Sequence, residues 1–163
     1  MGLSLKVLGG SKAKKALAQI EARFGRAGRV EVGFFPEATY PPRKGAKEPL
    51  YVAQVALWNE NGTHSADGKQ HVPPRPFMAT TVKTYSGSWG RLFAAAAQMH
   101  AYDAEAALGV VGEKMKDQMV QTIVDFSTPA NAPTTIKKKG FDDPLIETGH
   151  MMRSVRAKVE MNE

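Results

Sequence analysis

Cysteine is absent from this 163-residue chain. Disulfide bonds, thiolate chemistry and cysteine-containing zinc sites are therefore excluded. Long apolar runs are missing as well. None reaches the roughly 18 residues of a membrane-spanning helix, and the N-terminal "MGLSLKVLGGSKAKK" has no apolar signal core. We expect a protein that makes no contact with a membrane.

The sequence also lacks the motifs of common enzyme classes. It contains no G-x-S-x-G, no Walker sequence, no G-x-G-x-x-G and no H-E-x-x-H. The histidines are His64, His71, His100 and His150. They lack metal-ligand spacing; His64 and His71 share a loop and could approach each other, but we interpret them as solvated. Asp142 and Asp143 could serve as catalytic or metal-binding carboxylates, although adjacent acids after a lysine run are more often a solvated turn. We predict no enzyme activity, no cofactor and no metal.

Length and composition are those of one globular domain. The 163 residues can bury a core of their own, so we treat residues 1–163 as a single domain. Hydrophobic residues make up 42% and charged residues 23%, which is ordinary for a globular chain. The net charge of +6 permits contact with nucleic acid or an acidic partner. Many globular proteins carry as much charge, so it does not define the partner.

Hydrophobic periodicity predicts a mixed order of strands and helices. Alternation predicts strands at 3–7, 29–35 and 154–161, and helical spacing predicts helices at 11–25, 50–61, 76–100 and 103–126. An interruption is expected near residues 86–88 of the third helix. The fourth helix is the longest, and Asp103 can cap it. This order indicates an α+β fold in which a small, mainly antiparallel sheet is packed by a long helix.

Three long polar loops, at 36–49, 62–76 and 127–147, are expected to project from this fold. Compact domains rarely keep loops of such length unless the loops bind something. The most unusual stretch is "TPANAPTTIKKKGFDDPLIETGH", with three prolines and the lysine run Lys137–Lys139. Two interpretations of the lysines stay open: contact with phosphate or an acidic protein surface, or a solvated charge run.

Two motifs bracket the longest predicted helix. In "ALWNENGT" and "VPPRPFM", a helix end that contains E-x-G is followed by P-x-R-P-F; the matching residues are Glu60, Gly62, Pro74, Arg75, Pro76 and Phe77. In "PLIETGHMMRSV", a PL-x-x-TG-x-L/M-x-x-S run precedes the last strand; the matching residues are Pro144, Leu145, Thr148, Gly149, Met151 and Ser154. Together they resemble the neck and tail-completion proteins of long-tailed bacteriophages, a group of tail components that act in virion morphogenesis.

The resemblance implies a structural virion protein of the head–tail junction, made in the host cytoplasm, that joins the tail to the head and lets DNA pass. The implied partners are a homo-oligomeric ring, often six-fold, the adjacent connector, tail-terminator or tail-tube proteins, and the DNA in the channel. An alternative from another class is a basic nucleic-acid-binding module that uses Lys137–Lys139 and Arg75.

Under this resemblance the three loops serve assembly, and the 127–147 loop is an arm that becomes ordered against a neighbouring subunit. The residues expected at the interface are Arg75, Asn131, Thr135, Lys137, Lys138, Lys139 and Phe141. The prolines on both sides of Arg75 fix an extended backbone, so we expect Arg75 to be held outward or against a carboxylate. Phe77 should begin the next helix and anchor it in the core.

Overall fold

A computed structural model describes residues 10–24, 28–42, 45 and 47–162. Within these residues the element order is α1 (Ser11–Phe24), β1 (Gly28–Gly33), α2 (Val52–Asn61), β2 (Thr63–His64), β3 (Gln70–Val72), α3 (Phe77–Met99), α4 (Ala104–Asp125), α5 (Pro133–Lys139), α6 (His150–Arg153) and β4 (Arg156–Met161). The strand predicted at 3–7 lies outside the described residues. The predicted α+β class is confirmed.

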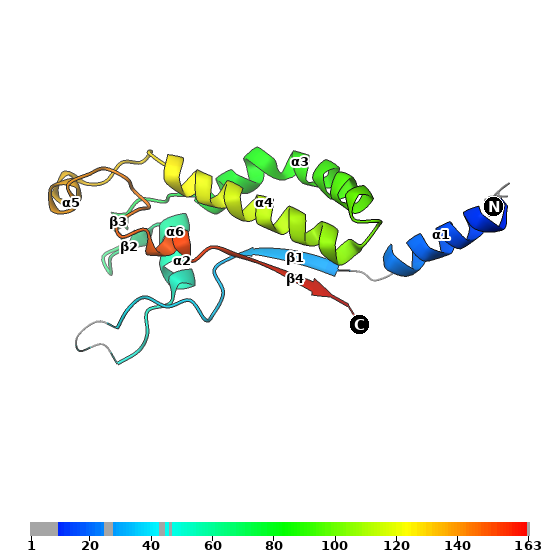
Figure 1. Cartoon of the computed structure of the whole chain (residues 1–163). Helices are drawn as coiled ribbons and strands as arrows, with labels where there is room; N and C mark the ends of the chain where they lie inside the picture. The colour runs from blue at the N-terminus through cyan, green and yellow to red at the C-terminus, as the bar shows by residue number, and fades with distance from the viewer. Residues whose placement is uncertain (1–9, 25–27, 43–44, 46, 163) are drawn as a thin grey trace.

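The central sheet pairs β1 with β4, which are antiparallel and far apart in the sequence. Val30 lies opposite Val159 in the register, and Val32 lies opposite Ala157. These apolar side chains face α4, which packs along both strands (Figure 1). The intervening residues are exposed and charged, and Arg29 forms ion pairs with Glu31 and Glu160. One face of the sheet is therefore covered by the long helix and the other is wet, as the alternation predicts.

Helix α4 comes close to the sheet at Gly112. A Cβ atom added there would lie 2.7 Å from Cγ2 of Val30 and 3.2 Å from Cβ of Ala157. Asp103 caps the helix, and its side chain accepts a hydrogen bond of 3.1 Å from the backbone N–H of Ala106. The predicted helix and its cap are both confirmed, but α4 has 22 residues and α3 has 23, so the prediction that α4 is the longest helix is wrong.

Helices α3 and α4 form an antiparallel hairpin (Figure 1). The turn between them places Ala101 and Tyr102 at φ 52° and 62°, in the left-handed region that side chains other than glycine rarely adopt. Helix α3 runs without a break from Phe77 to Met99, so the interruption predicted near 86–88 is wrong. Gly87 and Ser88 are exposed on this helix, where their low helix propensity is overridden by packing of its other face.

The larger core cluster lies where α2, the start of α3, α4 and α6 meet. Its buried members are Val52, Ala56, Phe77, Met119, Ile123, Leu145, Met151 and Val155. Phe77 is fully buried, and its ring meets that of Phe34 edge-on with centroids 6.1 Å apart. The expectation that Phe77 anchors α3 in the core is confirmed.

Two of the loops contain regular structure that the sequence reading did not anticipate. The 62–76 loop holds the short antiparallel hairpin of β2 and β3. The 127–147 loop holds α5, whose first residue is Pro133 and whose last turn is closed by Gly140 at φ 84°. Proline is tolerated in the first turn of a helix because its missing N–H would have no partner there. The prediction that residues 127–147 form a loop throughout is therefore wrong.

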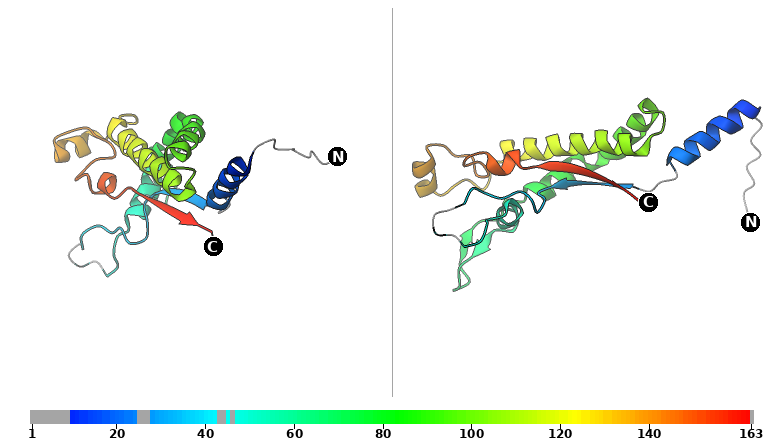
Figure 2. Two further views of the ribbon diagram at one scale, coloured as in Figure 1. Left: turned by 45° about the vertical axis from the view of Figure 1, so that its right-hand side comes forward. Right: turned by 60° about the horizontal axis from the view of Figure 1, so that its bottom comes forward.

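The molecule is elongated, with α5 and the α3–α4 turn at opposite ends (Figure 2). Helix α1 lies beyond the end of the sheet and projects outward, with its C-terminal end close to the α3–α4 turn (Figures 1 and 2). A hydrogen bond of 3.1 Å joins Nη1 of Arg23 to the backbone carbonyl of Ala101. None of the described α1 side chains belongs to a core cluster.

Candidate functional site

Arg75 is the centre of the candidate site, and only 7% of the residue is exposed. Its guanidinium donates to three backbone carbonyls: Nε to Pro129 (3.4 Å), Nη1 to Pro144 (3.3 Å) and Nη2 to Ala130 (3.4 Å). Nη2 also donates to the side-chain oxygen of Asn131 at 3.2 Å. Arg75, in the connection between β3 and α3, therefore forms hydrogen bonds with both ends of the segment that contains α5.

The expectation that Arg75 is held outward or against a carboxylate is wrong. Its acceptors are neutral, and in the described part of the chain no carboxylate oxygen lies within ion-pair distance of it. Burial lowers the pKa of Arg75, and the charge of nearby Asp142 opposes that shift. Arginine nevertheless stays protonated in proteins, so the site contains a buried positive charge.

Asn131 links Arg75 to Asp142, which follows α5 in the sequence. Its backbone N–H donates to Oδ1 of Asp142 at 2.9 Å, while its side-chain oxygen accepts from Arg75. Its side-chain nitrogen Nδ2 is buried and has no hydrogen-bond partner among the described residues. A buried amide without a partner costs free energy, so this nitrogen is an unused donor beside a buried cation.

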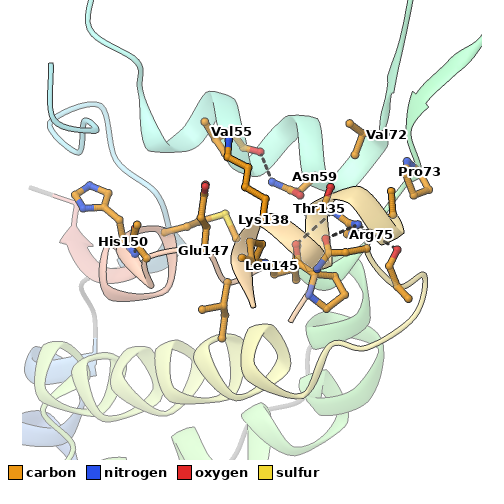
Figure 3. A pocket seen from close by; sticks show the side chains of 18 of the residues that line it. Val55, Asn59, Val72, Pro73, Arg75, Thr135, Lys138, Leu145, Glu147 and His150 are labelled. Carbon is orange, nitrogen blue, oxygen red and sulfur yellow. Dashed lines mark hydrogen bonds between the residues drawn. The ribbon is translucent and has the colours of Figure 1, made fainter. Parts of the chain in front are cut away.

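These residues line a pocket of about 750 Å³. In Figure 3 the Lys138 side chain, which comes from α5, extends toward Val55 on α2, so that α5 and α2 form facing walls. The charged side chains in the lining are Arg75, Lys138, Lys139 and Glu147. The apolar part includes Val55, Val72, Pro73, Leu145 and Ile146. A pocket with this lining can bind a group that is part acidic and part apolar.

The structure brings five of the seven expected interface residues into this pocket. Arg75, Asn131, Thr135, Lys138 and Lys139 line it, whereas Lys137 and Phe141 do not. Lys139 is engaged locally: its Nζ donates to the Asp143 carbonyl at 2.7 Å and lies 4.7 Å from the centre of the Phe141 ring. Lys138 is exposed and has neither an ion pair nor a hydrogen bond within the described ranges. Whether these residues contact a partner stays a prediction.

The histidines do not form a site together. His71 and His150 line the pocket, whereas His64 and His100 do not. The ring Nε2 of His150 lies 2.9 Å from the Thr39 carbonyl, and the ring packs against Tyr40 with centroids 4.7 Å apart. Across the residues that the structure describes, no group of three or more His, Asp or Glu side chains could hold a metal ion. No helix in the same residues is long and apolar enough to cross a membrane.

Sequence reasoning missed the wall that α2 contributes. Val55 and Asn59 lie one turn apart on α2, and the Asn59 side chain donates to the Val55 carbonyl at 2.9 Å. The backbone carbonyl of Asn59 accepts a hydrogen bond of 2.6 Å from the backbone N–H of Arg75. The helical stripe of Val52, Val55, Ala56 and Asn59 was the available signal, because an asparagine on an apolar stripe marks a polar contact within a packed face. This stripe could not show that the α5 segment forms the opposite wall of the pocket.

Comparison with protein-family models, with curated proteins and with solved structures found no match for this chain. The resemblance to neck and tail-completion proteins therefore rests on the two motifs.

Proposed function

We propose that this chain is a non-enzymatic structural subunit of the head–tail junction of a long-tailed phage particle, where copies form a ring that joins the tail to the head and lets DNA pass. The observation that carries the proposal is the contact between the two motifs. Arg75 of the first motif donates to the carbonyl of Pro144 in the second, although 69 positions separate them. Both motifs thus belong to one structural unit.

The remaining motif residues have structural tasks that agree with such a role. Both side-chain oxygens of Glu60 accept hydrogen bonds of 2.9 Å, from the backbone N–H groups of Met78 and Ala79 at the start of α3. Gly62 has φ 71°, and a Cβ there would lie 2.6 Å from the Val72 carbonyl. These residues fix how the elements join, which is what a subunit needs when it must present fixed surfaces to its neighbours.

A particle experiment tests the proposal. In particles assembled from the genome that encodes this chain, gold-labelled antibody against it should mark the point where head and tail meet. Deleting its gene should yield separate heads and tails, and supplying the protein should restore joined particles. Joined particles in normal number without the protein would contradict the proposal.

A nucleic-acid-binding module is the second candidate, favoured by the exposed Lys137 and Lys138 at the tip of the molecule. It predicts binding to double-stranded DNA that weakens steeply with salt, because binding releases counterions from phosphates. The variant Lys137→Gln/Lys138→Gln should lower that affinity and the salt slope together. DNA binding at physiological salt without any ring formation would favour this candidate over the first.

A further inference from the structure

The pocket beside α5 contains positive charge that no carboxylate of the described residues neutralises by an ion pair, and one buried donor without a partner. The guanidinium of Arg75 is buried against neutral acceptors, Nδ2 of Asn131 is buried without a partner among the described residues, and the Lys138 side chain extends toward Val55 on the facing wall (Figure 3). The pocket lining contains three cationic side chains and a single acidic one, Glu147. An incoming carboxylate would meet a favourable field here, since a partly desolvated site strengthens electrostatic attraction.

The apolar lining indicates what carries that carboxylate. Val55, Val72 and Leu145 line the same pocket, and its volume of about 750 Å³ is large for a lone anion. Free phosphate and nucleic-acid backbone offer no apolar group for this surface. A protein segment that combines an acidic side chain with an apolar one fits both parts of the lining.

The opposite end of the same molecule presents such a segment. At the α3–α4 turn, Met99 is 82% exposed, and Glu105 is exposed with no ion pair in the described part of the chain. Ala101 and Tyr102 hold this turn in a left-handed conformation, which costs backbone energy and often accompanies function. A flexible methionine side chain fills irregular apolar pockets well.

We propose that the α3–α4 turn of one copy, with Met99 and Glu105, docks into the Arg75–Lys138 pocket of a second copy. The two surfaces differ and lie at opposite ends of the elongated body (Figures 1 and 2), so the contact is heterologous and continues from copy to copy. Arg23, which contacts the turn at the Ala101 carbonyl, offers a cation for Glu147 at the pocket. The inference rests on the proposed function, because it specifies the contact that builds the ring.

Charge reversal of the full-length chain tests this pairing. Sedimentation velocity at low ionic strength should show association of the unaltered protein that rises with concentration and falls with added salt. Lys138→Glu and Glu105→Lys should each weaken association on the order of tenfold, since each replaces an attraction by a repulsion. An equimolar mixture of the two variants should restore association, because each altered surface then meets its opposite charge on the other variant.

Matched variants separate this pairing from a general charge effect. Lys137→Glu makes the same charge change one residue outside the pocket lining, and Asp117→Lys makes it on an exposed face of α4. Both should associate like the unaltered chain. Glu105→Gln removes the charge without reversing it and should weaken association less than Glu105→Lys. Circular dichroism on every variant checks that the fold is kept.

The inference is overturned if the unaltered protein stays monomeric at all concentrations, or if it associates and the mixture of reversed variants is no stronger than either alone. Neither result decides the proposed function, which the gold-labelling and gene-deletion experiments test separately. A protein found at the head–tail junction whose association ignores these charges would keep the function and discard this contact.

Discussion

At the scale of single residues, Arg75 is the most consequential side chain in the described structure. A buried cation is costly unless its donors are used, and here four hydrogen bonds of 3.2–3.4 Å use most of them. Three of the acceptors are backbone carbonyls that would otherwise need another donor or water. Arg75 therefore fixes the shape of the α5 segment, and with it the shape of the pocket.

Replacing Arg75 by methionine should loosen this segment. Arg75→Met keeps much of the apolar stem but leaves the Pro129, Ala130 and Pro144 carbonyls without their donor, at a cost of about 2–3 kcal/mol. The unfolding temperature should fall by roughly 4–12 °C for a chain of this size, and a lysine-specific protease should cut at Lys137–Lys139 sooner. Arg91→Met, on the exposed side of α3, is the matched control and should change neither quantity. Equal cleavage rates for both variants would contradict the role assigned to Arg75.

Phe77 offers a second test at this scale. It is fully buried in the larger core cluster, so Phe77→Ala should lower the free energy of unfolding by about 3–5 kcal/mol. Phe141→Ala removes the same atoms from an exposed ring and should cost less than about 1 kcal/mol. Denaturant unfolding of the two variants measures the difference. Similar losses from both would mean that the core does not depend on Phe77.

At the scale of elements, contact between α4 and the sheet decides the architecture. The sheet has two strands in the described residues, and a two-stranded sheet is marginal in water unless something packs on it. Helix α4 supplies that packing along both strands, and Gly112 lets the helix approach closely. Elsewhere on α4, Gly109 faces open space.

The two glycines of α4 form a matched pair for an experiment. Gly109→Ala should raise the free energy of unfolding by about 0.5–1 kcal/mol, because alanine is the better helix former. Gly112→Ala gains the same propensity but forces a Cβ to within 2.7 Å of Val30, so it should be less stable than Gly109→Ala by about 1–3 kcal/mol. Thermal unfolding gives both values. If the two variants were equally stable, α4 would not be tightly seated on the sheet.

Elements with strong periodicity were predictable from the sequence, and short elements made by tertiary contact were not. Helix α4 and strand β4 follow apolar spacings that the structure confirms. Helix α5 has no apolar stripe; it depends on Pro133 in its first turn, Gly140 at its end and the anchoring of its flanks by Arg75. Arg75 itself was singled out, but its burial was not expected, because the carbonyls that surround it come from residues 54 to 69 positions away.

At the scale of the whole molecule, the described structure has a body with two ends and one helix set apart from it. One end carries the cationic pocket, and the other carries the α3–α4 turn with its exposed methionine (Figure 2). An elongated subunit with different surfaces at its two ends is suited to head-to-tail association, which closes into a ring when the rotation between copies permits.

Helix α1 should contribute little to the stability of the isolated body. A single helix of 14 residues is marginal in water without a packing partner. Leu17 is 50% exposed, and of residues 11–23 only Ile20 is even partly buried. Leu17→Ala should therefore change the free energy of unfolding by no more than about 0.5 kcal/mol. The same substitution at Leu145, which is buried in the larger core cluster, should cost about 2–5 kcal/mol. Denaturant unfolding at low protein concentration, where copies are apart, compares the two. A loss at Leu17 close to that at Leu145 would mean that α1 packs on the body of its own chain, and that the apolar side of α1 is not available to a neighbouring copy.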